Sequence, residues 1–394
     1  MQFGRALVAS WDAGAADAPR NGKGDENMER RPFEALYVHV PFCADVKCAY
    51  CAFYSVPAAP SGLVDAYLAE VEKRLRSANF ERPVRSVYIG GGTPTALDSD
   101  GMARLFDAIA DAVPIAFGAE VSVECNPETL TPEKAAVLGR FANRVSLGVQ
   151  SFDPEILGIL GRRGSPEDFR RAVELLGNAG VANLGCDLIH SVPGENADGW
   201  RRDLEAAAES GVSHVSTYSL TIEEGTALAE TADPIDGDAD AAMWELAGDI
   251  LEGRGFERYE VSNFARSGAE CRHNLEVWFG GTLLGVGPAA SSFDGFDRWT
   301  EPADIAAWLD GEPPGVDAVS AERRADEIFA MGMRAAKGWT EALLRARTGF
   351  GMERWRVVLG ELAGMDLVAL EPDAAAPTRK GMELWDSIAE RLLL

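Results

Sequence analysis

The stretch from His39 to Cys51 reads HVPFCADVKCAYC and carries three cysteines, Cys43, Cys48 and Cys51, within nine residues. Three thiolates on one short loop match three of the four irons of a [4Fe-4S] cube, and the missing fourth thiolate leaves one iron open to a non-protein ligand. An iron with a free coordination site indicates a cluster that binds a reactant rather than one that only stores electrons. We therefore predict that these three cysteines hold a [4Fe-4S] cluster.

Two other roles of clustered cysteines stay open. A structural zinc site needs a fourth ligand, and the only local candidate is His39, because no second C-x-x-C follows. Cysteines that serve packing alone are the other role. Disulfides are disfavoured, since six cysteines in 394 residues without a secretory signal are typical of a protein from a reducing cytosol.

Composition excludes some partners. The chain has 37 Lys and Arg against 63 Asp and Glu, a net charge of -26, which repels phosphate backbones and anionic lipid. No apolar run approaches the length of a membrane span. We therefore expect a soluble cytoplasmic protein that binds no nucleic acid and has no transmembrane segment.

The length of 394 residues favours a main domain with an appended one. Residues 1–32 lack an amphipathic period, and we expect a disordered leader there. We further expect a barrel core over residues 33–230, a barrel extension and linking region over 231–315, and a separate C-terminal domain over 316–394.

From Glu34 onward, short β-branched or aromatic runs alternate with helical stretches. Helices are predicted over 62–78, 132–140 and 166–178, the last two after a Thr131 and a Ser165 cap. Strands alternating with crossover helices form a parallel sheet, and six units give a partial barrel where eight would close one. The fold class is therefore α/β, a partial (β/α)6 barrel of the TIM type, with strands at 35–40, 86–89, 120–124, 144–149, 183–189 and 213–220.

Chemically useful residues follow these strands. The cysteines come after the first strand, a Gly90-Gly91-Gly92-Thr93-Pro94 turn after the second, and Glu124, Gln150 and Asp187 near the ends of the next three. In a parallel barrel the carboxyl ends of the strands meet at one face, which carries the active site. We therefore predict one site at that mouth.

Three of these segments resemble motifs of the radical S-adenosylmethionine (SAM) family: His39-x-Pro41-Phe42-Cys43, the glycine turn, and Gly148-Val149-Gln150-Ser151-Phe152. The similarity runs from about Tyr37 to the C-terminus and is greatest to the coproporphyrinogen-oxidase-like branch. The resemblance implies that SAM binds the open iron and that an electron from a donor such as a flavodoxin or ferredoxin splits it into methionine and a 5'-deoxyadenosyl radical.

The same resemblance implies a set of residues that contact SAM. Three positions depart from the family pattern. The first two cysteines are separated by four residues instead of three, Gly164 stands where relatives carry His, and Ser291 stands where another His is common. A loop longer by one residue still allows the thiolates to converge. The implied SAM contacts are Tyr37, Gly91, Gly92, Thr93, Glu124, Gln150, Arg162 and Asp187.

The segment His273-Asn274-Leu275-Glu276-Val277-Trp278 resembles the His-Asn-x-x-Tyr-Trp marker of a haem-chaperone branch, with Val277 in place of Tyr. An imidazole and an indole suit ligation of haem and stacking on it, so His273, Asn274 and Trp278 are the predicted haem contacts. Haem would be cargo for a target protein. Two alternatives stay open: an oxygen-independent coproporphyrinogen III oxidase, and a degenerate homologue without a cluster.

The C-terminal part, from about Val316, resembles the mostly helical, winged-helix-like tail of this branch. A winged helix raises the question of DNA binding, but the acidic net charge argues against it. A lid or partner-docking role is therefore expected. The predicted helices span 321–336, 340–347, 352–362 and 380–393, with a β element at 366–370.

Overall fold

A computed structural model describes residues 30–231 and 236–393 of the protein. Residues 1–29 of the predicted leader lie outside the described part. Six parallel strands pair in the order β1, β4, β5, β6, β7 and β8, as the sequence predicts. They are β1 (Ala35–Val40), β4 (Val84–Gly91), β5 (Ile115–Cys125), β6 (Arg144–Gln150), β7 (Asn183–His190) and β8 (His214–Ser219).

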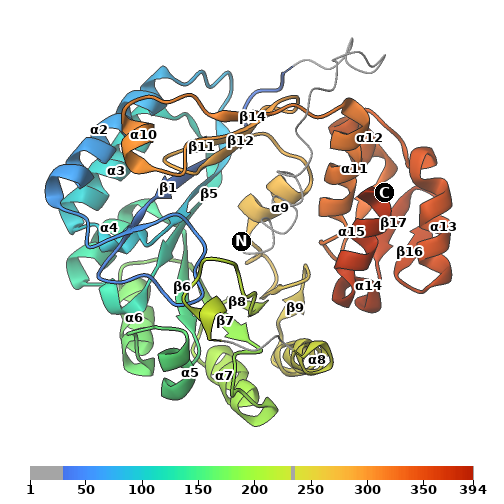
Figure 1. Cartoon of the computed structure of the whole chain (residues 1–394), viewed down its shortest axis with the longest axis horizontal. Helices are drawn as coiled ribbons and strands as arrows, with labels where there is room; N and C mark the ends of the chain where they lie inside the picture. Colours follow the sequence, from blue (N-terminus) through green and yellow to red (C-terminus); the bar gives the residue numbers. More distant parts are fainter. Residues whose placement is uncertain (1–29, 232–235, 394) are drawn as a thin grey trace.

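Helices cross between these strands and cover the outside of the sheet (Figure 1). Their starts follow local capping chemistry: the Ser165 side chain accepts from Asp168 N in a capping box, and Thr131 accepts from Lys134 N. Within the described residues, no helix is both long and apolar enough to cross a membrane. The helices are α2 (Ser61–Ser77), α3 (Ser99–Ala112), α4 (Pro132–Phe141), α5 (Pro154–Ile159), α6 (Pro166–Asn178), α7 (Ala197–Glu209) and α8 (Gly237–Gly253).

The sheet stays open and is longer than six strands. A seventh parallel strand, β11 (Leu283–Val286), pairs with β1, and antiparallel strands extend both edges to give twelve strands in all among the described residues. The prediction of a partial barrel is therefore confirmed for its six strands. Strands from later in the sequence extend the sheet beyond the prediction. The edge strands are β9 (Glu257–Arg258), β10 (Asn263–Ala265), β12 (Ser291–Phe293), β13 (Arg298–Thr300) and β14 (Gly315–Asp317).

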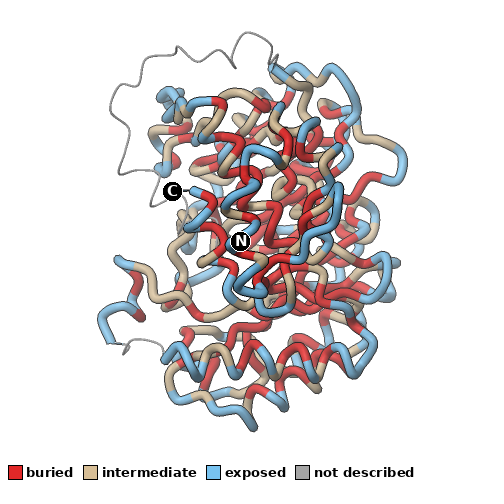
Figure 2. Tube along the Cα trace, turned by 90° about the vertical axis from the view of Figure 1, so that its right-hand side faces the viewer, coloured by how far each residue is buried: buried red, intermediate tan, exposed pale blue. Residues whose placement is uncertain are grey.

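The two faces of the barrel strands differ. Leu36, Val38 and Val40 of β1 are buried in the main apolar core between the sheet and its helices. Figure 2 shows the buried residues in red along the Cα trace, concentrated in its interior. Because side chains alternate along a strand, the residues between them face the barrel interior. There the strands present polar side chains. They are Glu120, Ser122 and Glu124 on β5, and Arg144 and Ser146 on β6. The interior is thus built for a polar ligand rather than for packing alone.

The C-terminal part has its own apolar core and lies beside the barrel, at the right of Figure 1. A helix, a short strand, two helices and a hairpin follow one another, the order of a winged helix, and the three strands pair as β15-β17-β16. The predicted winged-helix-like tail is therefore present. Its elements are α11 (Ala321–Gly332), β15 (Trp339–Thr340), α12 (Glu341–Thr348), α13 (Arg356–Gly364), β16 (Val368–Glu371), β17 (Ala374–Pro377), α14 (Arg379–Glu383) and α15 (Trp385–Leu393).

Candidate functional site: a polar pocket at the barrel mouth

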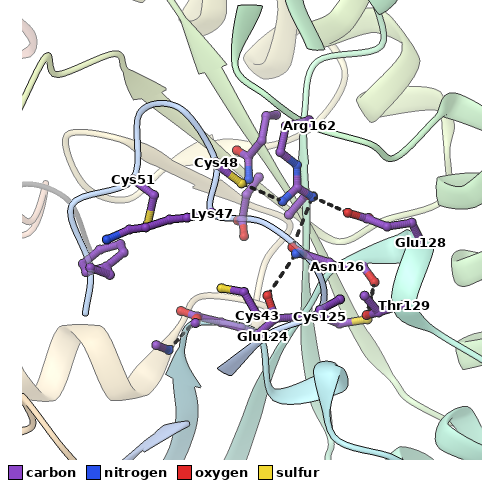
Figure 3. Close-up of a pocket in the computed structure, with 18 of the residues that line it drawn as sticks. Cys43, Lys47, Cys48, Cys51, Glu124, Cys125, Asn126, Glu128, Thr129 and Arg162 are labelled. Carbon is purple, nitrogen blue, oxygen red and sulfur yellow. Dashed lines mark hydrogen bonds and ion pairs between the residues drawn. The ribbon is translucent and has the colours of Figure 1, made fainter. Parts of the chain in front are cut away.

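A pocket opens at the carboxyl ends of the barrel strands, and the cysteine loop (residues 41–60, between β1 and α2) borders it (Figure 3). Cys43, Cys48 and Cys51 all line this pocket and are partly exposed. Two backbone hydrogen bonds hold the loop down, from Ala49 N to Leu160 O at 3.0 Å and from Leu228 N to Ala49 O at 2.8 Å. The loop is therefore fixed against the barrel where its thiols face the pocket.

The three cysteines are free thiols on one loop. In the described part of the chain, no three His, Cys, Asp or Glu side chains are grouped as they would be around a single metal ion. Burial raises the pKa of the Cys43 thiol and raises the pKa of Cys51 to about 11. Since the thiolate is the form that binds metal, metal binding here must release protons.

The three glycines after β4 are crowded by the chain itself. A Cβ at Gly90 would lie 2.7 Å from a Glu124 oxygen, one at Gly91 2.7 Å from the His39 ring, and one at Gly92 2.5 Å from the carbonyl oxygen of Phe42. Gly91 also has φ +112, which side chains rarely adopt. This turn therefore needs glycine in order to pack β4 against β1 and the cysteine loop, whatever else the pocket holds.

Two carboxylates form the floor of the pocket. Glu124 accepts from Tyr88 Oη at 2.9 Å and from Gly91 N at 3.0 Å, and Asp187 accepts from Ser146 and Ser216 at 3.0 and 2.6 Å. Burial raises the pKa of both carboxyl groups. A cationic or hydroxyl-bearing ligand would give these oxygens the partners that water gives them elsewhere.

Arg162 lies beside Cys48 of the cysteine loop, with its side chain only 4% exposed. Its guanidinium donates to Gly148 O, to Asn126 Oδ1 at 3.1 Å and to Cys48 Sγ at 3.6 Å, as Figure 3 shows in part. Its buried Nε has no partner, and the nearest carboxylate, Glu128, lies at 3.5 Å. A planar fork with an unused donor is suited to a carboxylate ligand.

Seven of the eight predicted SAM contacts line this pocket, and Tyr37 does not. Its hydroxyl lies 3.0 Å from His39 Nδ1, and His39 packs under Gly91. Tyr37 therefore contacts His39, which packs against Gly91 of the pocket, and does not itself line the pocket. The seven that line it are Gly91, Gly92, Thr93, Glu124, Gln150, Arg162 and Asp187.

Among the lining residues without a sequence prediction are Asn126, Glu128 and Thr129. They follow β5 directly, and their position after a strand of the parallel sheet is the signal that could have identified them. Glu128 also bears on Gly164, because a Cβ there would lie 2.9 Å from Glu128 Oε2. Glu128 thus occupies space beside the position where relatives carry His.

Helix α9 (Arg272–Trp278) inserts its N-terminus into the base of the barrel. Glu120 of β5 caps it by accepting from Arg272 N at 2.8 Å and from His273 N at 3.2 Å. The three predicted haem contacts therefore separate. His273 is 2% exposed with Nδ1 2.9 Å from Ser86 Oγ, Asn274 lines the mouth pocket, and Trp278 lies beside Arg334. Porphyrin contact with His273 requires α9 to move, and haem binding by these three residues stays a prediction.

Stability should depend on pH through His273. Burial lowers the pKa of its imidazole to about 4, whereas an unfolded His titrates near ~6.5. The unfolded chain takes up this proton first as the pH falls, so His273 lowers the free energy of unfolding between those two values. Urea denaturation should therefore show that the free energy of unfolding falls less between pH 7 and pH 5 for His273→Gln than for the wild type. Equal losses in the two proteins would show that His273 does not contribute.

Comparison with known proteins agrees with this architecture. Residues 37–207 match the Radical SAM superfamily. The chain is 37% identical to a Mycobacterium tuberculosis protein named heme chaperone HemW, over 95% of this chain and 98% of the relative, and 31% identical to the protein of the same name from Lactococcus lactis, over 93% and 99%.

A solved structure of Escherichia coli coproporphyrinogen III oxidase (HemN), described as a radical SAM enzyme, has the same fold, with a TM-score of 0.80 over 98% of both chains at 20% identity. At 20% identity, the similarity to this structure shows a shared fold and nothing more. The matched residues 37–207 contain the three cysteines and all seven pocket-lining SAM positions. The chain therefore belongs to the radical SAM superfamily and, within it, to the family of the HemW relatives.

Proposed function

We propose that this protein is a haem chaperone that binds a [4Fe-4S] cluster and SAM at the barrel mouth. The observation that carries the proposal is that one pocket is lined by all three loop cysteines and by seven residues predicted to contact SAM. The names of the relatives that match nearly the whole chain support haem as the cargo.

The donor set fits an iron-sulfur cluster. Cys43, Cys48 and Cys51 offer three soft ligands on an anchored loop, the ligand type and number that a [4Fe-4S] cube with one open iron requires. When bound, the cluster would supply the electron that cleaves SAM. The protein's own contribution is to orient the ligand and to exclude water from it.

The pocket chemistry also fits SAM. Arg162 would hold the methionine carboxylate with its guanidinium, while Glu124 and Asp187 would accept from the amino group and the ribose hydroxyls. Each of these groups is partly buried and held by neighbours before any ligand binds. Little side-chain ordering is then needed on binding, which favours affinity.

Arg162→Met should weaken SAM binding. A lost charge-assisted hydrogen bond costs about 1.5–3 kcal/mol, which corresponds to roughly 10- to 100-fold in dissociation constant. Equilibrium binding of SAM to the anaerobic protein measures it. The matched control is Arg170→Met, since Arg170 is exposed on α6, pairs with Glu167 at 2.7 Å and is not among the residues that line the pocket. Equal affinities of the Arg162 variant and the wild type would remove Arg162 from the SAM site.

The cargo is tested by two anaerobic measurements on the reconstituted protein. Haem titration should give a stable complex, and coproporphyrinogen III should not be turned over. Turnover would instead favour an oxygen-independent coproporphyrinogen III oxidase, and the absence of haem binding would reject the chaperone. We further propose a cytoplasmic protein that takes its electron from a flavodoxin or ferredoxin and hands haem to a target protein.

A further inference from the structure

A second hollow lies at the other end of the barrel strands from the mouth pocket. Ser86, near the start of β4, lines it, whereas Gly91, at the end of β4, lines the mouth. Its remaining walls come from the outer face of α9 and from the winged-helix-like part. The hollow thus lies where the barrel, α9 and the C-terminal part meet, in the region around α9 in Figure 1.

Four cations line this hollow, Arg85, Arg272, Lys337 and Arg347, in a chain whose net charge is -26. Two of them are already neutralised. Arg347 pairs with Glu34 and Glu276, and Arg85 lies 2.6 Å from Glu276 and 3.3 Å from Glu34. These pairs hold α9 to the barrel and to the C-terminal part.

The other two cations are exposed and have weak carboxylate partners. The Arg272 side chain is 59% exposed; its guanidinium donates to the neutral Gly118 O at 3.0 Å, and its closest carboxylate, Glu120, lies at 3.9 Å and already accepts from two backbone N–H groups. Lys337 is exposed, and its ammonium lies 4.5 Å from the centre of the Phe279 ring, with no carboxylate of the described residues within 4.0 Å. Two positive charges are therefore available to an anionic ligand.

Between the cations the wall is apolar. Leu275 and Leu343, both partly exposed, line the hollow together with Phe279. A ligand that satisfies this surface carries a hydrophobic body and carboxylates at one edge. Haem has that form, with an apolar macrocycle and two propionates side by side.

We propose that this hollow is the docking site for the propionate edge of haem, with Arg272 and Lys337 holding the carboxylates. The inference rests on the proposed function and adds to it a place for the cargo that leaves His273 buried. It also links the two ligands. One face of α9 lines this hollow, while Asn274 of the same helix lines the mouth pocket, so a shift of α9 would be felt at both.

The test is haem titration of the full-length reconstituted protein, followed by absorbance. The double variant Arg272→Gln/Lys337→Gln should bind haem ~10-fold or more weakly than the wild type, because two charge-assisted contacts are lost. The matched control is Arg140→Gln/Arg201→Gln, which removes the same charge from exposed positions on α4 and α7 and should bind as the wild type does. Haem dimethyl ester, which lacks the carboxylates, should not distinguish the double variant from the wild type.

The outcomes separate the two claims. Wild-type affinity of the double variant for haem would overturn the docking site and leave the chaperone proposal standing. Absence of haem binding to the wild type would overturn both. Equal weakening in the Arg140 and Arg201 control would show a general charge effect and would also overturn the docking site. Both altered residues are exposed, and thermal melts of all three proteins should coincide.

Discussion

Cys48→Ala is expected to reduce the iron and sulfide of the anaerobically reconstituted protein from about four of each per chain to a small fraction. Cys48 is the middle of three thiol ligands, and its sulfur also accepts from Arg162. The two thiolates that remain bind only two of the irons, so the cluster should no longer be retained in the open pocket. Iron and acid-labile sulfide analysis, together with the visible absorbance of the protein, measures the loss.

Cys125→Ala is the matched control for this prediction. Cys125 lines the same pocket, but it is 2% exposed and its thiol lies 3.6 Å from Asn126 O. It should behave as a small buried residue, and the variant should keep its iron. If Cys125→Ala lost as much iron as Cys48→Ala, Cys125 would be a fourth ligand and the open iron would not exist.

Glu260→Ala is expected to lower the free energy of unfolding by about 3–5 kcal/mol, because it removes the carboxylate that pairs with the buried guanidinium of Arg334. Glu260 is fully buried and lies 3.0 Å from Arg334, whose side chain is 4% exposed. Glu260 also accepts from Ser262 N and from Asn263 Nδ2. This cluster joins the end of the barrel sheet to the C-terminal part, so its loss should loosen both. Urea denaturation followed by tryptophan fluorescence measures the change.

Asp65→Ala provides the comparison for the buried pair. Asp65 forms an ion pair with Arg104 at 2.5 Å, but both side chains are more than half exposed. Water screens such a pair, so the denaturation curve should stay nearly unchanged. A loss for Glu260→Ala no greater than that for Asp65→Ala would mean that the buried pair does not hold the two parts together.

Local signals were enough to predict the six barrel strands. They are runs rich in β-branched or aromatic residues, and helices between them begin at capping residues such as Ser165. Strand β11 had no such signal. Its four residues, Leu283–Val286, gain their place from pairing with β1 across about 250 positions of sequence, and only the folded chain brings the two strands together.

The candidate site divides in the same way. The cysteines and the glycine turn could be identified from the sequence because each follows or closes a strand and belongs to a motif, and Arg162 was implied by the family resemblance. The positions of the α9 side chains could not be predicted from the sequence. Its Asn274 reaches the mouth pocket and its His273 is buried because Glu120, over 150 residues earlier, caps the helix inside the barrel.

The most direct test of the central claim is the EPR spectrum of the reduced, reconstituted protein with and without SAM. If the three cysteines hold a cluster whose open iron faces the pocket of Arg162, Glu124 and Asp187, adding SAM should change the spectrum of the wild type. Arg162→Met should need more SAM for the same change. A cluster signal that SAM leaves unaltered at any concentration would contradict the account, as would a reconstituted protein that holds no iron.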